Sequence, residues 1–373
     1  MKVALVYDRV NKFGGAERVL LALHQIFPDA PLYTLVYDSK SAPWAKDFKI
    51  ISTFLNHIRF LQHKHEWLAP IAAMAFESLD LRDFDVIISV TSSDAKAVIT
   101  KPNQLHICYC LTPTRYFWSG EEQYSQDKKF KIIPQWLKHY FRTTDLLISQ
   151  RPDQYIAISK EVKDRILKYY YRDSSVIYPS IEDKFYSKDL IPMSERDGYL
   201  IVSRLVPYKK VDLAIHAFNI LKKPLTVVGI GSELQHLKNI SESTITFVGA
   251  VSDERLIEYY RHARAVIFPQ EEDYGLVPIE AQANGTPVIA YDRGGALETI
   301  VSDKTGLFFD QQTPESLVKA VEKFEKAKIS PQDCYQNSLR FNNQNFKKNF
   351  TAKITELWLN HLAHPATKVL SAN

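Results

Sequence analysis

Two glutamates, Glu272 and Glu280, have seven residues between them in a segment that is otherwise largely apolar. The apolar runs 265–269 and 288–291 on either side predict buried parallel strands. The residues between them predict a turn that carries Glu272 and a helix that carries Glu280. In open α/β sheets such a turn lies at the carboxyl edge, where ligands bind, so both carboxylates could face one cleft. The alternative is an acidic turn followed by a carboxylate that stabilises a helix N-terminus, and the spacing alone leaves both interpretations open.

Two cations, Arg204 and Lys209, lie five positions apart in a turn that follows the predicted strand 199–203. Arginine offers a planar pair of donors and lysine a compact charge, so together they suit a diphosphate. The alternative is ordinary solvated surface charge.

Two glycines, Gly14 and Gly15, separate a predicted strand at 2–7 from an amphipathic helix. A glycine pair there lets backbone N–H groups approach an anion at the helix N-terminus, although a simple tight turn has the same composition. Asp83 and Asp85 have the D-x-D spacing that holds a metal in other proteins. They precede a predicted strand and therefore lie on the amino side of the sheet, so we predict no metal site.

The chain has 373 residues, 45% of them hydrophobic, which is enough for two domain cores. The net charge of +4 is too small to indicate nucleic-acid binding. Cys108, Cys110 and Cys334 show neither metal nor disulfide spacing, which favours a reducing compartment. No apolar run reaches the length of a membrane span, and the first strand is too short for a signal peptide.

Predicted strands alternate with helices along the chain, which is typical of Rossmann-like α/β domains. The polar, proline-containing residues 181–197 predict a linker. We therefore expect an N-terminal domain at 1–180 and a C-terminal domain at 198–335, followed by aromatic-rich helices at 336–373.

The Glu272 to Glu280 segment resembles the E-x7-E signature of retaining glycosyltransferases of family 4, which have the GT-B fold. Arg204 and Lys209 match the R-L-x-x-x-K segment of that family, and Gly14-Gly15 match its glycine loop. Residues 112–118 resemble the T-P-x-R-Y-x-W part of a segment found in a subgroup that includes O-antigen mannosyltransferases, with Leu111 where the subgroup has histidine. The resemblance is strongest over 198–320.

This resemblance implies an α/β, GT-B fold with two Rossmann-like domains facing across a cleft and C-terminal crossover helices at 336–373. The N-terminal domain would bind the acceptor and the C-terminal domain a nucleotide sugar. Arg204 and Lys209 would stabilise the leaving diphosphate, Glu272 would bind the donor sugar, and Glu280 would bind the ribose. The other residues that the resemblance places at the donor are Gly14, Gly15, Arg115, Gly249, Asp273, Tyr274, Gly275 and Leu276.

The implied reaction transfers a sugar with retained anomeric configuration and uses neither a metal nor a cofactor. The subgroup resemblance favours GDP-mannose as donor and a glycan or polyprenyl-linked oligosaccharide as acceptor, in cell-surface polysaccharide synthesis. The alternatives are a non-catalytic GT-B subunit that binds nucleotide sugar and a nucleotide-sugar epimerase of the same fold. The sequence names neither the acceptor, the linkage nor the oligomeric state.

Residues 128–142 contain five Lys or Arg residues and no acidic residue, interleaved with aromatic and aliphatic side chains. Residues 57–67 add Arg59, Phe60, Lys64 and Trp67. This composition predicts peripheral attachment to an anionic membrane, on the cytoplasmic face of the plasma membrane. The alternative is an amphipathic helix packed on its own domain with a solvated basic face.

Overall fold

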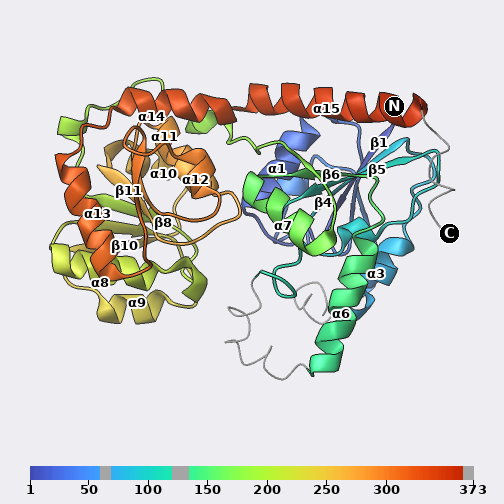
Figure 1. The fold of residues 1–373 in the computed structure, drawn as a ribbon, viewed down its shortest axis with the longest axis horizontal. Helices are drawn as coiled ribbons and strands as arrows, with labels where there is room; N and C mark the ends of the chain where they lie inside the picture. Colours follow the sequence, from blue (N-terminus) through green and yellow to red (C-terminus); the bar gives the residue numbers. More distant parts are fainter. Residues whose placement is uncertain (59–68, 120–133, 364–373) are drawn as a thin grey trace. The chain divides into compact units, whose positions relative to one another are not determined.

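The computed structural model describes residues 1–58, 69–119 and 134–363. Contacts divide the chain into two compact units, which we treat separately (Figure 1). Unit 1 contains Met1–Ser180 and Gln344–Asn373, and unit 2 contains Ile181–Asn343. Each unit is a parallel sheet covered by helices, as the alternation of strands and helices predicts.

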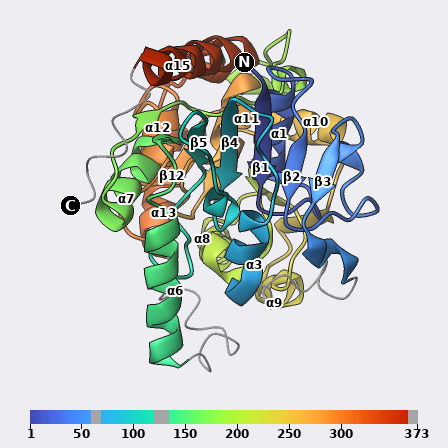
Figure 2. The same cartoon turned by 90° about the vertical axis from the view of Figure 1, so that its right-hand side faces the viewer.

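The described part of unit 1 contains a parallel sheet in the order β3-β2-β1-β4-β5-β6-β7 (Figure 2). Its strands are β1 (Val3–Tyr7), β2 (Leu32–Thr34), β3 (Ile50–Ser52), β4 (Val86–Thr91), β5 (Leu105–Cys110), β6 (Gln154–Ala157) and β7 (Ser175–Val176). Its α-helices are α1 (Gly15–His24), α3 (Ala69–Glu77), α6 (Gln135–Ile148), α7 (Lys160–Tyr170) and α15 (Asn343–Ala363), the last belonging to this unit from Gln344.

The strand order of unit 1 reverses between β1 and β4. Leu5 of β1 lies beside Leu32 of β2 on one side and Ile88 of β4 on the other. The chain first runs outward through β2 and β3, then returns to β4 and runs outward in the opposite direction. Open α/β sheets bind ligands at the carboxyl edge of such a reversal.

Unit 2 has a parallel sheet in the order β10-β9-β8-β11-β12-β13, and its strand order reverses between β8 and β11. Its strands are β8 (Tyr199–Val202), β9 (Leu225–Val228), β10 (Ile245–Gly249), β11 (Ala265–Phe268), β12 (Val288–Tyr291) and β13 (Gly306–Phe309). Its α-helices are α8 (Val211–Leu221), α9 (Leu234–Ile240), α10 (Asp253–His262), α11 (Leu276–Ala283), α12 (Ala296–Thr299), α13 (Pro314–Lys326) and α14 (Pro331–Ser338).

Short 3-10 helices occur in the connections of both units. They are η1 (Pro43–Ala45), η2 (Phe54–His57), η4 (Ala95–Ala97), η5 (Asp183–Phe185), η6 (Met193–Glu195), η7 (Pro207–Lys209) and η8 (Leu339–Phe341).

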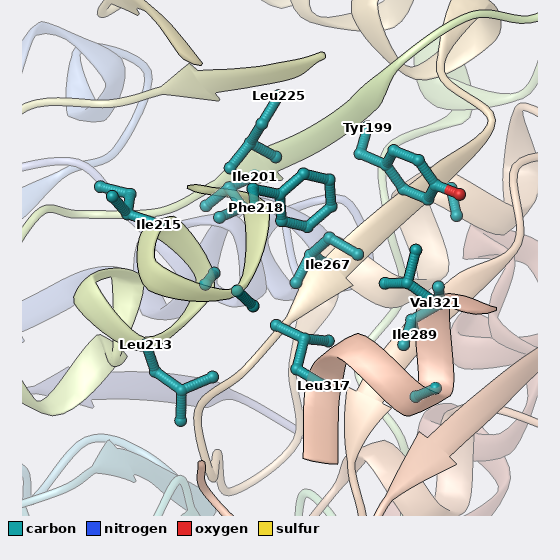
Figure 3. Close-up of a cluster of buried hydrophobic side chains, with 14 of the residues drawn as sticks. Tyr199, Ile201, Leu213, Ile215, Phe218, Leu225, Ile267, Ile289, Leu317 and Val321 are labelled. Atoms are coloured by element: carbon teal, nitrogen blue, oxygen red, sulfur yellow. The ribbon is translucent and has the colours of Figure 1, made fainter. Parts of the chain in front are cut away.

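One hydrophobic core of unit 2 lies between the sheet and helices α8 and α13 (Figure 3). Phe218 of α8 and Leu317 of α13 are fully buried against Ile201 and Ile267 of the central strands. These strands are apolar on consecutive residues because helices cover both faces of a parallel sheet. The core therefore holds β8 and β11 together, and with them the turns that follow these strands.

Two segments near the division of the chain, helix α15 and residues 181–197, each pack within one unit. Phe350 of α15 lies with its ring 5.2 Å from that of Tyr109 in β5. Residues 181–197, predicted as a linker, are grouped with unit 2. Within them Arg196 is only 3% exposed and donates to Thr286 Oγ1 at 2.6 Å.

A serine directly before a helical segment predicts an N-cap, and Ser159 stands directly before residues 160–170. The structure confirms this, because Ser159 Oγ accepts a hydrogen bond from Val162 N at 3.1 Å at the start of α7. Cys108, Cys110 and Cys334 are free and buried. Among the described helices, none combines the length and apolar character that crossing a membrane requires.

Candidate functional site

The strand-order reversal of unit 2 brings Lys209 and Glu272 together. Lys209 ends η7, in the connection after β8, and Glu272 lies in the turn after the neighbouring strand β11. Lys209 Nζ forms an ion pair with Glu272 Oε1, and the two side chains are 13% and 15% exposed. The structure therefore joins two residues that the sequence placed on separate motifs.

Tyr208 connects the two cations of the R-L-x-x-x-K segment. The guanidinium of Arg204 donates to the Tyr208 hydroxyl and lies 5.9 Å from the centre of its ring. Lys209 Nζ lies 5.3 Å from the same ring centre. Arg204 itself is exposed, so its positive charge is accessible to a ligand while its position is restrained.

Gly294 and Gly295 support the acidic turn from the end of β12. Gly295 N donates to Glu272 O at 2.8 Å. A Cβ atom on Gly294 would lie 2.4 Å from Glu272 O, and one on Gly295 would lie 2.3 Å from Tyr274 Cα. Only glycine permits this approach of two backbones. We did not predict these residues as part of the site, although a Gly-Gly pair before a helix was visible in the sequence.

The second glutamate of the signature is buried in α11. Glu280 is 5% exposed and accepts a hydrogen bond from Tyr260 OH at 2.8 Å. Tyr260 lies on α10, so this hydrogen bond joins α11 to α10. Glu272 and Glu280 thus have different partners, the first a cation and the second a buried phenol.

The residues between the two glutamates form the entry to α11. Asp273 and Tyr274 are 8% and 4% exposed, so their side chains are packed rather than open. Gly275 precedes the helix with φ +86°, and a Cβ there would lie 3.0 Å from Phe268 Cζ, so a side chain is disfavoured. Leu276 is the first residue of α11.

Gly249 ends β10 and differs from Gly275, the other glycine of unit 2 that the resemblance places at the donor. Its φ is +73°, and a Cβ atom placed on it would meet no atom within 4 Å. Its backbone is therefore open on the side where other residues carry a side chain.

In unit 1 the glycine pair starts α1, as expected from the sequence. Gly14 is the N-cap, and none of the side chains that the structure describes caps the helix. Glu17 in the first turn is 1% exposed and accepts a hydrogen bond from Tyr7 OH at 2.6 Å. Burial and the Glu17 charge raise the pKa of Tyr7 well above its ordinary value, so this phenol stays protonated.

The segment 112–118 is held by a buried carboxylate that we did not predict from the sequence. Asp145 of α6 accepts hydrogen bonds from Thr114 Oγ1 at 2.9 Å, Trp118 Nε1 at 2.7 Å and Lys96 Nζ at 2.7 Å. Lys96 is 1% exposed and Asp145 3%. Nothing in their local sequence predicts burial, because the burial arises from packing between distant segments.

Arg115 and Leu111 are the other two positions in or beside this segment that the sequence singled out. Arg115 is partly exposed, and its carbonyl accepts from Trp118 N at 3.2 Å. Leu111, where the mannosyltransferase subgroup has histidine, is 8% exposed at the end of β5.

The D-x-D residues lie at the amino edge of the unit 1 sheet. Asp85 Oδ2 accepts from Lys2 N at 2.7 Å, beside the start of β1. Over residues 1–58, 69–119 and 134–363, no group of three or more His, Cys, Asp or Glu side chains is arranged to hold a metal ion.

The C-terminal part of the chain matches a known protein family. Residues 183–341 match the family model "Glycosyl transferases group 1". The chain is 32% identical over 149 residues to a GDP-mannose-dependent alpha-(1-6)-phosphatidylinositol monomannoside mannosyltransferase of Mycobacterium tuberculosis, covering 35% of this chain and 38% of that protein. It is 26% identical over 276 residues to alpha-1,3/1,6-mannosyltransferase ALG2 of Mus musculus, covering 65% of each. It is 29% identical over 168 residues to O-antigen chain mannosyltransferase RfbU of Salmonella typhimurium, covering 42% and 46%.

Each of these alignments spans less than two thirds of the relative's length. Solved structures match over nearly the whole chain. Sucrose-phosphate synthase from Thermosynechococcus elongatus has a TM-score of 0.74 at 17% identity and covers 96% of this chain and 100% of its own. Anabaena Alr3699/HepE in complex with UDP-glucose has a TM-score of 0.70 at 17% identity and covers 95% and 100%.

These matches confirm the predicted fold class, an α/β GT-B fold with two Rossmann-like units. The chain carries a glycosyl transferases group 1 domain over residues 183–341 and, among the proteins of that fold, resembles mannosyltransferases.

Proposed function

We propose that this protein is a retaining, metal-independent glycosyltransferase that moves mannose from GDP-mannose onto a glycan or lipid-linked acceptor in cell-surface polysaccharide synthesis. The observation that carries the proposal is the Lys209–Glu272 pair at the strand-order reversal of a glycosyl transferases group 1 domain, beside Arg204. Cations and a carboxylate at one edge of the sheet suit a ligand that has both phosphates and sugar hydroxyls.

The chemistry follows from where charge develops. When a nucleoside diphosphate leaves, negative charge grows on its β-phosphate, and Arg204 and Lys209 stabilise it as fixed cations. Glu272 accepts hydrogen bonds from the hydroxyls of the donor sugar, and its pairing with Lys209 restrains it for that role. We assign no side chain as a nucleophile, because the acceptor hydroxyl attacks on the face that the leaving phosphate occupies and that phosphate takes its proton.

Two further donor contacts are part of the proposal. Glu280 binds the ribose hydroxyls, for which it would exchange or share its Tyr260 partner. The open backbone of Gly249 admits the nucleotide base. The donor roles of Gly14, Gly15 and Arg115 in unit 1 stay predictions.

The choice of GDP-mannose is supported by two kinds of resemblance. Residues 112–118 resemble a mannosyltransferase segment, and a relative with 32% identity is named as GDP-mannose-dependent. Structures such as that of Alr3699/HepE contain UDP-glucose, which makes a UDP-sugar the donor to exclude.

A ligand screen and a matched set of variants test the proposal. GDP-mannose should raise the melting temperature of the full chain more than UDP-glucose does, because binding to the folded state stabilises it. Arg204→Ala or Lys209→Ala should lower mannose transfer by about 100-fold or more. Lys210→Ala is the control, since Lys210 is exposed in the same turn.

Four results would each contradict a different part of the proposal. Normal transfer by folded Arg204→Ala and Lys209→Ala would exclude these cations from the reaction. Transfer from UDP-glucose with none from GDP-mannose would correct the donor. An epimeric nucleotide sugar formed without acceptor would identify an epimerase, and binding without any donor consumption would identify a non-catalytic subunit.

We also propose that α6 attaches the protein to an anionic membrane surface on the cytoplasmic side. Trp136 and Tyr140, one helical turn apart, are 71% and 55% exposed, and Lys138 is partly exposed between them. In both views this helix extends beyond the sheet of its unit (Figures 1 and 2). An exposed aromatic face suits a membrane interface, and the charge of Lys138, on another face of the same helix, adds attraction to anionic lipids.

Other residues of the predicted membrane segment lie outside the described residues. These are Lys128, Lys129, Lys131, Arg59, Phe60, Lys64 and Trp67.

Vesicle sedimentation tests the attachment. Wild type should bind phosphatidylglycerol vesicles but not phosphatidylcholine vesicles, and added salt should weaken binding. Trp136→Glu with Tyr140→Glu should release it, whereas Leu147→Glu, equally exposed at the other end of α6, should not. Binding that ignores both lipid charge and the paired change would leave α6 as ordinary surface.

A further inference from the structure

Unit 1 has a strand-order reversal of its own, besides the one in unit 2 where Lys209 and Glu272 meet. It lies between β1 and β4. Asp8 and Arg9 follow β1, and Ser93 and Asp94 follow β4. Parallel sheets bind ligands at the carboxyl edge of such a reversal, so these polar residues stand where a ligand is expected.

Asp8 is fully engaged in holding the two strand ends together. Its carboxylate accepts hydrogen bonds from Thr91 Oγ1 at 2.6 Å, Ser92 N at 2.9 Å and Ala95 N at 3.0 Å. These contacts fix the turn after β4 against the end of β1. Asp8 is 5% exposed, so it is a structural carboxylate rather than one presented to a ligand.

Asp94 differs from Asp8, because only one of its two carboxylate oxygens accepts a hydrogen bond from the described residues. Ser93 Oγ donates to Asp94 Oδ2 at 2.7 Å, and Tyr116 OH lies 2.8 Å from Ser93 Oγ. A serine hydroxyl has a single proton, so Tyr116 must donate to Ser93 while Ser93 donates to the carboxylate. Asp94 Oδ1 accepts no hydrogen bond from the described residues, and the residue is partly exposed.

Among the residues that the structure describes, Asp94 forms no ion pair. The ammonium of Lys96 pairs instead with Asp145. Burial raises the pKa of Asp94 to about 6; the charge of Lys96 and the Ser93 hydrogen bond lower it, and the carboxylates of Asp8 and Asp145 raise it. A carboxylate kept in such surroundings is typical of a functional site.

Arg9 contributes positive charge to the same end of the sheet. It is partly exposed, and its charge acts on Tyr116, whose hydroxyl orients Ser93 and thereby Asp94. Within the described residues it has neither a hydrogen bond nor an ion pair, so it can also donate to a ligand.

We propose that Asp94 is a sugar-binding residue of unit 1 whose Oδ1 accepts a hydrogen bond from a hydroxyl of the carbohydrate acceptor. Ser93 and Tyr116 are positioning residues that hold the carboxylate. The statement that this carbohydrate is the acceptor rests on the proposed function. The statement that Asp94 binds a sugar is independent of the proposed function.

Saturation-transfer NMR with methyl α-D-mannopyranoside and the full chain tests this assignment, with GDP present at saturation. Asp94→Asn should raise the dissociation constant of the mannoside about tenfold or more, the usual effect of losing a hydrogen bond to a charged group. Asp83→Asn removes the same charge from the amino edge of the same unit and should change nothing. Glu272→Ala should also leave this binding intact, which separates it from the donor-sugar position in unit 2.

Two readouts distinguish binding from a structural role. Mannoside affinity should fall as pH is lowered from 7 to 5 in the wild type and should be flat in Asp94→Asn. Tyr116→Phe should weaken the mannoside severalfold without changing GDP affinity. Absence of mannoside binding in the wild type, equal binding in Asp94→Asn, or a pH-independent wild type would each overturn the assignment. A different result would refute the proposed function alone. In that case the protein would neither bind nor turn over GDP-mannose, but its mannoside binding would still depend on Asp94.

Discussion

Removing the carboxylate of Asp145 should destabilise unit 1 strongly. Asp145 is 3% exposed and accepts hydrogen bonds from Lys96, Thr114, Trp118 and Tyr170 at 2.7 to 2.9 Å. It joins α6, α7 and the segments that follow β4 and β5. In Asp145→Ala the ammonium of Lys96 would stay buried without the carboxylate with which it forms an ion pair.

The size of the effect follows from burial. Burial alone would lower the pKa of Lys96, but the Asp145 charge raises it above its ordinary value, so the lysine is charged in the folded protein. Breaking a buried pair by removing one partner costs about 3–5 kcal/mol. Each neutral donor left unpaired adds about 1 kcal/mol or more. We therefore expect the free energy of unfolding to fall by about 4 kcal/mol or more.

Urea unfolding of the full chain, followed by tryptophan fluorescence and circular dichroism, measures the loss. The double variant Lys96→Met with Asp145→Leu should be less destabilised than Asp145→Ala, because it removes both charges and keeps the volume. The control is Asp80→Asn, which breaks the ion pair between Asp80 Oδ2 and Arg82 Nη2, 2.6 Å apart. The side chains of Asp80 and Arg82 are 60% and 69% exposed. That change should leave stability nearly unaltered despite the equally short distance, since water screens exposed charges.

The reasoning would be refuted if Asp145→Ala lost less than about 1 kcal/mol, the range of an exposed pair. It would also be refuted if the double variant lost as much as the two single changes added together, because the pair would then have no coupling energy.

The remaining predictions concern the donor site and pH. Glu272→Ala should abolish transfer while GDP binding persists, whereas Glu280→Ala should weaken GDP itself; calorimetry with GDP and with GDP-mannose compares them, and equal loss of GDP would contradict the division. Gly294→Ala should lower the melting temperature and donor affinity, because its φ is +64° and the new Cβ would lie 2.4 Å from Glu272 O; an unchanged variant would show that the turn can move. Transfer should survive excess EDTA, and loss restored by Mg²⁺ or Mn²⁺ would reveal a metal requirement. Because the pKa of Asp94 is about 6 in the folded protein and lower in the unfolded chain, the folded state binds more protons between pH 4 and 6, so Asp94 should make stability fall as pH rises through that window. Asp94→Asn should remove this fall from the wild-type denaturation profile, and an unaltered profile would argue against the raised pKa.

The sequence by itself determined the local features of this protein. Apolar runs with short turns predicted strands that are buried on both faces, and Ser159 predicted a helix start that the structure shows. Residue spacing also placed Glu272 in a turn and Glu280 on the helix after it, as observed. These features depend on neighbours along the chain, so a single sequence contains the information that decides them.

Only the tertiary structure decided which of these features meet. Lys209 reaches Glu272 because β8 and β11 are adjacent, although β9 and β10 lie between them in the sequence. Asp145 is buried against Lys96, 49 positions away, for the same kind of reason. Strand order and helix packing are set by the burial of apolar surface over the whole unit, and no local pattern specifies which distant polar groups that burial encloses.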